Sequence, residues 1–398
     1  MCLNMIVKNE ERNVGALIKS LLGHIDSFCV CDTGSTDGTL ASMNKIFNQI
    51  NVKGIFVQQK WKNFAYNRNL CMRYGEANLK NKCEYWLILD ADQVLISSDN
   101  ITLKDLSLDK DAYWLTEVSH GLEFSNMKIL KSSHPWFYQG VIHETIKTNV
   151  EPSVGELPKS IYTLHDTKHE RGFEHDIRVM QEGLEEDPND TRLIFHLAKA
   201  LHVVNKTASV PHYMKRISFG ETPGLEEVFW SKYSLGIIIE SAFADPGNNE
   251  ELNAVLKSTG MIQGGRPEFT DVINAYTAAA MDRPYRYEPW ARLGALYLNH
   301  QNDFKKCFEY ANRGLNAGPI MHYTLFAQNT TIYSLHHLCC WCGSLDSSMD
   351  DKVQPKTSCK KIVDDLSILP NPSDLEKAMV ADARKILSEI FYSVSQEQ

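Results

Sequence analysis

The feature that most constrains the fold is a regular alternation of two hydrophobic patterns over the first 95 residues. Short apolar runs at residues 3–7, 27–31, 52–57 and 85–89 have the length and composition of strands. In the segments between them, apolar residues recur every three or four positions, as they do on one face of a helix. This alternation is typical of a parallel sheet covered by helices. We therefore predict a doubly wound α/β domain in the first half of the chain.

Two aspartates, Asp90 and Asp92, directly follow the last of these runs. Residues 85–89 are apolar or aromatic throughout, as expected of a central strand that is buried on both faces. Ligands of such sheets bind beyond the carboxyl ends of the strands. Mg²⁺ and Mn²⁺ prefer one or two carboxylates together with ligand phosphates, so the pair predicts a divalent-cation site. The alternative is a pair of solvated carboxylates at the end of a loop.

A second polar motif follows the run at 27–31. Asp32 at the end of that strand can accept hydrogen bonds from a base or a ribose. Gly34 permits a tight turn, and Ser35 or Thr36 can cap the helix that follows. The alternative is an ordinary strand-turn-helix corner without a ligand.

Arg68 is expected in or near the first turn of the helix that follows the third run. A guanidinium at that place can reach a phosphate, and an exposed Trp61 or Phe64 can flank a ligand. The alternative is that both aromatic side chains pack in the core and that Arg68 pairs with a neighbouring residue.

Four motifs in this part of the chain occur together, in order: CLNMIVKNE at 2–10, DTGSTDGT at 32–39, FAYNRN at 64–69 and LDAD at 89–92. In this order and spacing the sequence resembles family 2 glycosyltransferases of the GT-A fold over roughly residues 1 to 170. The resemblance implies a Rossmann-like catalytic domain with a mostly parallel central sheet. It also implies that Asn9, Glu10 and Asp32 contact the nucleoside of a nucleotide-sugar, and that Asp37 supports this pocket.

The same resemblance implies roles for three further residues. Arg68 would lie near the diphosphate or the sugar. Asp90 would contact the ribose or the donor sugar, and we count it among the catalytic residues as well. Asp92 would hold a Mn²⁺ or Mg²⁺ ion that bridges the diphosphate.

The middle of the chain adds a hairpin and a candidate base. Residues 112–119 and 122–131 alternate in polarity around Gly121 and predict two antiparallel strands. The segment HPWFYQGVIHE at 134–144 resembles the acceptor-side segment of the family. Inverting transfer needs a base for the acceptor hydroxyl, and we assign Glu144. Alternatively Glu144 caps a turn or pairs with His143, in which case Asp166 or His143 would be the base.

His165 ends another apolar segment, at 161–165. Related enzymes often supply a late histidine as an additional metal ligand, and His165 fits that role by resemblance. The alternative is a structural histidine. The sequence after it, Asp166-Thr-Lys-His, departs from the Gly-Tyr that is common in the family.

From residue 173 the pattern changes to long amphipathic helices, so we divide the chain into a GT-A domain at 1–172 and an all-α domain at 173–398. The spacing of Trp290, Leu293, Gly294 and Tyr297 is close to that of tetratricopeptide-type repeats. Such a domain is either a helical cap on the catalytic domain or a concave surface that holds a peptide acceptor or a dimer partner.

Composition excludes several classes of protein. The net charge of -9, without a block of Lys and Arg, argues against a nucleic-acid-binding surface. No apolar run is long enough to span a bilayer, and the six-residue run after Met1 is too short for a signal peptide. We therefore expect a cytoplasmic protein whose ten cysteines are mostly free, buried thiols.

One cluster of histidines and cysteines near the end of the chain resembles zinc-site residues, but its spacing fits zinc sites poorly, and thiols of a helical core are the better interpretation. The residues concerned are His336, His337, Cys339, Cys340, Cys342 and Cys359.

Together these features predict an inverting, metal-dependent glycosyltransferase. By resemblance its donor is a nucleotide-sugar, most often a UDP-sugar, and its acceptor is a glycan or a polypeptide. On this view the helical domain could also form a homodimer. The alternative is a non-catalytic helical-repeat scaffold that carries a degenerate transferase domain. A nucleotidyltransferase is disfavoured because the polar turn after the first strand is acidic and lacks a glycine-rich, basic phosphate loop.

Overall fold

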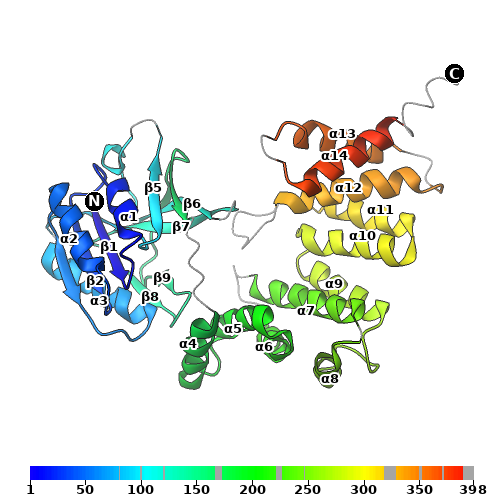
Figure 1. The fold of residues 1–398 in the computed structure, drawn as a ribbon, viewed down its shortest axis with the longest axis horizontal. Helices are drawn as coiled ribbons and strands as arrows, with labels where there is room; N and C mark the ends of the chain where they lie inside the picture. Colours follow the sequence, from blue (N-terminus) through cyan, green and yellow to red (C-terminus); the bar gives the residue numbers. More distant parts are fainter. Residues whose placement is uncertain are drawn as a thin grey trace. The chain divides into compact units, whose positions relative to one another are not determined.

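The alternating patterns of the first half build a sheet with helices on both faces, and the second half is helical (Figure 1). This confirms the predicted α/β domain followed by an all-α domain. The structure, a computed structural model, describes residues 1–79, 81–98, 101–119, 122–165, 173–220, 226–245, 247–317, 329–348, 352–369 and 372–388. It divides into two units, residues 1–189 and 190–398. The sequence placed this boundary at 172/173, where the helices begin.

Four parallel strands form one half of the sheet, in the order β3-β2-β1-β4. They are β1 (Cys2–Val7), β2 (Ser27–Asp32), β3 (Ile55–Gln58) and β4 (Tyr85–Ile88). β3 begins later than predicted because Val52, just past the end of the preceding helix, still donates its N–H to the carbonyl of Phe47 in the last turn of that helix. The parallel arrangement brings the polar residues after β1, β2 and β4 to one edge of the sheet.

The other half of the sheet is mixed and continues from β4 as β7-β6-β11-β5, with β10 paired to β6. The predicted hairpin is confirmed: β6 and β7 are antiparallel neighbours. A separate two-stranded sheet consists of β8 and β9. The bounds are β5 (Gln93–Ser97), β6 (Ala112–Ser119), β7 (Leu122–Lys131), β8 (Phe137–Gln139), β9 (Thr145–Lys147), β10 (Val154–Glu156) and β11 (Ile161–His165), with a 3₁₀ helix at Leu103–Asp105.

The period of two along β1 separates the two cores of the first unit. Leu3, Met5 and Val7 pack with α1 (Val14–Ser20) and α2 (Thr39–Gln49) on one face. Cys2 and Ile6 belong to the core under α3 (Phe64–Leu79) on the opposite face. The first unit also includes α4 (Phe173–Glu186).

The second unit consists of helices that pack on their neighbours along the chain around one main core. Asp190 caps the first of these helices by accepting a hydrogen bond from the N–H of Leu193. Tetratricopeptide-type repeats stay a prediction. The helices are α5 (Thr191–Val204), α6 (Lys206–Ser218), α7 (Glu227–Ala244), α8 (Glu250–Ser258), α9 (Phe269–Asp282), α10 (Tyr287–Gln301), α11 (Phe304–Leu315), α12 (Asn329–Leu345), α13 (Val353–Leu366) and α14 (Asp374–Ile386).

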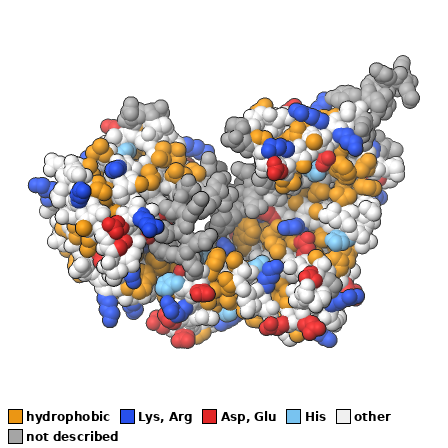
Figure 2. Space-filling view, viewed as in Figure 1, with side chains coloured by type: hydrophobic (Ala, Val, Ile, Leu, Met, Phe, Trp, Pro, Cys, Tyr) orange, Lys and Arg blue, Asp and Glu red, His pale blue; other side chains and the backbone are white. Residues whose placement is uncertain are grey.

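Among the described residues, no helix combines the length and the apolar character that crossing a bilayer requires. On the face drawn in Figure 2, Lys and Arg side chains are interspersed with Asp and Glu side chains.

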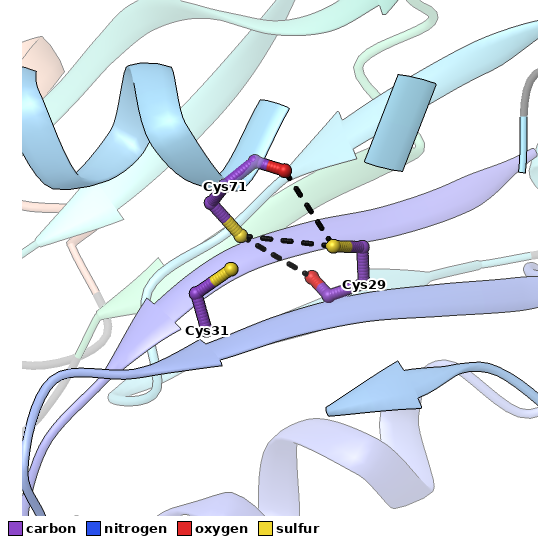
Figure 3. A group of neighbouring side chains, drawn as sticks. All are labelled: Cys29, Cys31 and Cys71. Carbon is purple, nitrogen blue, oxygen red and sulfur yellow. Dashed lines mark hydrogen bonds between the residues drawn. The ribbon is translucent and has the colours of Figure 1, made fainter. Parts of the chain in front are cut away.

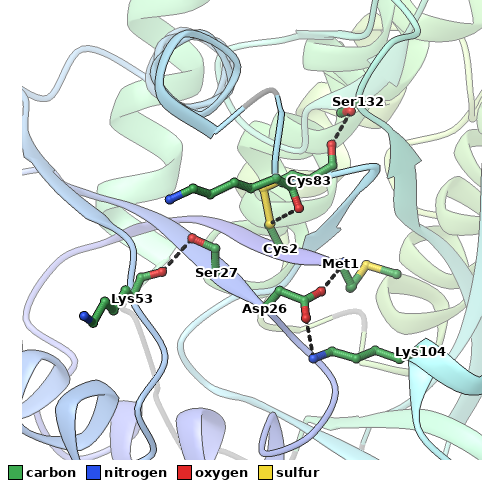
Figure 4. The surroundings of a disulfide bond; sticks show 9 residues. Met1, Cys2, Asp26, Ser27, Lys53, Cys83, Lys104 and Ser132 are labelled. Carbon is green, nitrogen blue, oxygen red and sulfur yellow. Dashed lines mark hydrogen bonds and ion pairs between the residues drawn. A yellow bond between two sulfur atoms is a disulfide. The ribbon is translucent and has the colours of Figure 1, made fainter.

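The prediction of mostly free thiols is wrong, because six of the ten cysteines form disulfides. Cys2 at the start of β1 is bonded to Cys83 just before β4, the strand that pairs with β1 (Figure 4). The other two bonds join neighbouring helices of the second unit, Cys307–Cys342 and Cys340–Cys359. The sequence could not show these pairs, since the partners meet only through packing. The bonded cysteines therefore give no support to the expected cytoplasmic location.

The disulfides also determine whether the cluster of histidines and cysteines in the second unit can bind zinc. Cys340 and Cys342 are oxidised, while Cys339 is a free, buried thiol. His336 shares a hydrogen bond with Ser358, and His337 with Asp382. Among the described residues of this cluster, Cys339 alone keeps a free thiol, so the several thiolates of a zinc–cysteine site are not present together here.

Candidate donor-binding and catalytic site

The loops after β1 and β2 are joined by side chain to backbone hydrogen bonds. Asn9 has a left-handed backbone with φ of 54°, and its N–H donates to Oγ of Ser35 at 3.0 Å. Its side-chain Oδ1 accepts from the N–H of Thr36 at 2.8 Å. The predicted nucleoside contact Asn9 therefore also fixes the two loops to each other.

Asp32 lies at the last position of β2 and is 2% exposed. Its carboxylate accepts hydrogen bonds from the N–H groups of Gly34 at 3.2 Å and Ser35 at 3.1 Å. Gly34 has φ of 104°, a backbone conformation that favours glycine. Asp32 thus shapes the turn that follows its own strand, in addition to the predicted role toward a nucleoside.

The predicted cap of α2 by Ser35 or Thr36 is wrong, because Gly38 is the N-cap residue and the side chain that bonds the first helical residue is that of Asp37. Its Oδ1 accepts from the N–H of Thr39 at 3.0 Å and from the Thr39 hydroxyl at 2.5 Å. The Thr39 hydroxyl in turn accepts from the N–H of Glu10 at 2.8 Å. Slight burial would raise the pKa of Asp37, but the hydrogen bonds from Thr39 and from the N–H of Glu11 outweigh it and lower that pKa. Asp37 therefore connects α2 to the loop that holds Glu10.

Arg68 pairs with two predicted site residues at once. Its Nη2 lies 2.6 Å from Oδ1 of Asp90, and its Nε lies 2.5 Å from Oε1 of Glu144. α3 begins at Phe64, so Arg68 lies early in the second turn, near the first turn as predicted. The Arg68 and Glu144 side chains are 9% and 12% exposed, whereas that of Asp90 is 41% exposed. Asp90 is therefore the member of this group that a ligand reaches most easily.

The charge balance of the group favours ionised Asp90. Burial alone would raise the pKa of Asp90, but the positive charges of Arg68 and Lys128 outweigh it and lower that pKa. A carboxylate held in this state accepts hydrogen bonds and donates none. This suits contact with the hydroxyl groups of a ribose or a sugar.

The segment before Glu144 is fixed to α3. Asn69 and Tyr138 exchange two hydrogen bonds: Asn69 Nδ2 donates to the Tyr138 carbonyl at 2.8 Å, and the Tyr138 N–H donates to Asn69 Oδ1 at 2.7 Å. The Phe64 N–H donates to the carbonyl of Val141 at 3.1 Å. His143 has φ of 52°, an uncommon conformation for a residue other than glycine. Glu144 thus reaches Arg68 from a loop with a tightly constrained backbone.

The two predicted metal ligands lie together. β11 pairs with β5, and Nε2 of His165 lies 3.1 Å from Oδ2 of Asp92. The other ring nitrogen of His165 lies 3.9 Å from Oε1 of Glu117. The hydrogen bond that His165 donates to Asp92 raises the pKa of His165 and outweighs the opposing effect of burial. One carboxylate and one imidazole suit Mn²⁺ when a diphosphate supplies further oxygens, so these residues fit the predicted ion.

Three residues of the site were not predicted. Oε1 of Gln93 accepts from the N–H of Asp90 at 3.0 Å and from Nζ of Lys128 at 3.2 Å. Nζ of Lys128 also lies 3.6 Å from Oε2 of Glu117. Lys128 and Glu117 are buried charged residues on β7 and β6. The only sequence signal for Glu117 and Lys128 was a charge inside a predicted strand, two positions from the apolar residues Leu115 and Leu130.

The predicted aromatic flank of the ligand and the alternative base remain to be placed. Trp61 and Phe64 lie edge to face at 4.8 Å and pack, partly buried, against the core under α3, which matches the alternative interpretation. Asp166, the alternative base, lies outside the described residues.

Comparisons with known proteins point to sugar transfer for the first part of the chain. Residues 2–99 match the family model described as "Glycosyl transferase family 2". The "SPbeta prophage-derived glycosyltransferase SunS" of Bacillus subtilis (strain 168) is 22% identical over 229 residues, which are 53% of this chain and 51% of SunS. The "Glycosyltransferase SunS" of Bacillus phage SPbeta matches with the same values. The chain thus spans about half the length of the curated relatives it matches.

Among solved structures, S. aureus TarS aligns with a TM-score of 0.33 and 16% identity over 72% of this chain and 55% of TarS. TarS 1-349 in complex with UDP-GlcNAc aligns with a TM-score of 0.33 and 15% identity, over 72% of this chain and 93% of that one.

Proposed function

We propose that the first unit is an inverting, metal-dependent glycosyltransferase whose donor is a nucleotide-sugar, preferably a UDP-sugar. The observation that carries this proposal is the convergence of Asp90, Glu144 and Arg68 beside the pair Asp92 and His165. These residues come from distant parts of the chain and meet near the carboxyl ends of the strands. The family model matched by residues 2–99 and the curated glycosyltransferases support the reaction class.

The donor occupies the edge formed by the loops after β1, β2 and β4 in this proposal. Asn9, Glu10 and Asp32 contact the nucleoside, and Asp37 holds their loops in place. Asp90, the exposed carboxylate of the Arg68 group, accepts hydrogen bonds from the ribose or the sugar. Arg68 supplies positive charge toward the diphosphate side.

Asp92 and His165 would hold Mn²⁺ or Mg²⁺, which supplies Lewis-acid stabilisation of the charge on the departing nucleoside diphosphate. Glu144 accepts the proton of the acceptor hydroxyl as that oxygen attacks the anomeric carbon. Arg68 holds Oε1 of Glu144, so we assign Oε2 to the acceptor proton. The bond from the anomeric carbon to the diphosphate oxygen breaks on the opposite face, and the configuration at that carbon inverts.

The acceptor in this proposal is a glycan or a polypeptide. A helical unit follows the catalytic one, and stacked helices of repeat proteins form extended surfaces that bind peptides. This favours a polypeptide acceptor, held by the helical unit or by a dimer that this unit forms.

The first experiment is thermal unfolding against a panel of nucleoside diphosphates and nucleotide-sugars, each with and without Mn²⁺. A ligand that binds only the native state raises the unfolding midpoint by mass action. We expect a metal-dependent increase with uridine nucleotides, and its loss in Asp92→Ala. If no nucleotide shifts the midpoint, the scaffold alternative is favoured and the helical unit carries the function.

A further inference from the structure

Three free cysteines of the first unit form a cluster that the proposed reaction does not use. Cys29 and Cys31 lie on β2, Cys71 lies on α3, and all three are 0% exposed (Figure 3). Their sulfur atoms lie within 4.8 Å of one another. The Sγ atoms of Cys29 and Cys71 are 3.8 Å apart. The fourth free cysteine of the chain, Cys339, lies in the second unit.

The cluster follows from the periodicities of its two elements. Residues 29 and 31 are two apart on a strand, so both side chains point to the same face of the sheet. That face is covered by α3, and Cys71 faces it together with Met72. Cys71 Sγ donates to the carbonyl of Met5 at 3.3 Å, which places it over β1 and β2. The convergence of the three sulfurs therefore joins one strand, β2, to one helix, α3.

The spacing of these sulfurs matches a metal centre. A Zn–S bond measures about 2.3 Å, so two sulfurs on one three- or four-coordinate ion stand about 3.8–4.0 Å apart. The measured 3.8 Å between two of the sulfurs lies in this range, and the upper limit of 4.8 Å for the group requires only small side-chain rotations. Soft thiolates select soft or borderline cations over Mg²⁺ and Ca²⁺. Among the described residues, this is the one group of three or more potential ligands that lies so close together.

We propose that Cys29, Cys31 and Cys71 form a three-thiolate site for a thiophilic cation of the Zn²⁺ or Cu⁺ class. On binding, the thiols release their protons to solvent and three sulfur–metal bonds form. No oxidant or reductant takes part. The site is separate from the Asp92 and His165 pair, whose oxygen and nitrogen ligands suit harder ions.

The proposed ion has a structural consequence. It links β2 to α3 directly before Asp32 in the sequence and one turn after Arg68 on the helix. A cross-link at this place restrains two elements that carry site residues. Metal binding to the native state then stabilises the first unit, whether or not the unit transfers a sugar.

The test uses Cd²⁺ as a spectroscopic probe on the full chain with its disulfides intact. The protein is incubated with Cd²⁺ under argon, desalted and analysed for bound cadmium and for sulfur-to-cadmium charge-transfer absorption. We expect one ion per chain with the band of a thiolate site. Cys29→Ser, Cys31→Ser and Cys71→Ser should each weaken binding at least tenfold, while Cys339→Ser, which removes the remaining free thiol, should bind like wild type.

A second measurement keeps the proposal testable if a serine variant does not fold by far-UV circular dichroism. X-ray absorption of the zinc-loaded wild-type chain should show three sulfur neighbours at about 2.3 Å. A shell of oxygen and nitrogen only, or a cadmium band that persists in folded Cys71→Ser, overturns the assignment. Absence of retained cadmium in wild type after prolonged incubation also overturns it, and the three thiols are then ordinary core residues.

Discussion

At the scale of single residues, one guanidinium organises the site. Arg68 contacts Asp90 and Glu144, which lie 22 and 76 residues away in the sequence. The planar, forked guanidinium can hold two carboxylates at once, whereas a lysine offers a single point charge. Two carboxylates this close together depend on the positive charge between them, so Arg68 serves both stability and the arrangement of the candidate base.

Replacement of Arg68 by alanine should destabilise the first unit. Removing one partner of a largely buried ion pair costs about 3–5 kcal/mol, because the remaining carboxylates stay without their charge partner. Chemical unfolding should therefore show a lower free energy of unfolding for Arg68→Ala. Arg73→Ala is the matched control, since Arg73 is an exposed arginine on the same helix. Equal stability of the two variants would contradict the role assigned to Arg68.

Replacement of Glu144 by glutamine should abolish proton acceptance while preserving shape. General-base catalysis contributes about 10²- to 10⁴-fold, so we expect the turnover of Glu144→Gln to fall by at least a hundredfold. Binding of UDP with Mn²⁺, measured by the thermal shift, should be nearly the same as in wild type. Full turnover in this variant would mean that another group, such as His143, accepts the proton.

At the scale of elements, the loops before α1 and α2 form one hydrogen-bonded unit. Asp37 accepts from Thr39 and from the N–H of Glu11, and Thr39 accepts from Glu10. An acceptor at the start of a helix satisfies N–H groups that lack a partner within the helix, and its negative charge interacts favourably with the helix dipole. The helix start and the predicted nucleoside loop therefore depend on the same carboxylate.

Asp37→Asn keeps an acceptor oxygen at the start of α2 but removes the negative charge there, so it should lower the free energy of unfolding by about 0.3–1 kcal/mol. The folded pKa of Asp37 is lowered, so its stabilisation is complete above the ordinary aspartate pKa of about 4 and is lost as the pH falls through the lowered value. The difference between wild type and variant should thus be largest near neutral pH and shrink in acid. Glu84→Gln, at an exposed position before β4, is the control. A difference that does not change with pH would rule out the ionised carboxylate as its source.

The disulfide between Cys2 and Cys83, at the end of the sheet where β1 begins, should stabilise the first unit. It closes a loop with a sequence separation of 81 residues, and such bonds contribute about 2–4 kcal/mol, mainly by restricting the unfolded chain. The double variant Cys2→Ala/Cys83→Ala should lower the unfolding temperature of the first unit. Cys307→Ala/Cys342→Ala should affect the second unit instead. Calorimetry distinguishes the two, and identical effects would contradict this assignment.

At the scale of the whole molecule, the chain consists of two units with separate cores. The first unit has a core on each face of its sheet, and the second has its own clusters between helices. Domains with separate cores can unfold independently. The proposed donor site lies entirely within the first unit.

Calorimetry should therefore resolve two unfolding transitions, only one of which responds to UDP with Mn²⁺. A ligand at 100 times its dissociation constant stabilises the state that binds it by about 2.7 kcal/mol. We expect the transition of the first unit to move to higher temperature and that of the second to stay. A joint shift of both transitions would show that the donor also stabilises the helical unit.

The sequence by itself determined the local elements and the main site positions. Strand and helix periodicities are local properties, so they indicated β1, β2 and β4, the β6–β7 hairpin and the helical second half. The polar residues after the strands could be identified as site residues because parallel strands bring their carboxyl ends to one edge of the sheet. Asp32, Asp90 and Asp92 could thus be named, and the resemblance added His165 and Glu144.

Only the tertiary structure decided which side chains meet. No sequence period specifies the partners or the backbone geometry on which several contacts depend. These are the contacts of Gln93 with Asp90 and Lys128, of Glu144 with Arg68 and of Asp37 with Thr39, and the three disulfides. The same holds for the three thiols, since only the packing of α3 on β2 brings Cys71 to Cys29 and Cys31. A local pattern predicts on which face of a strand or helix a residue lies, whereas the packing of distant segments determines which residues it contacts.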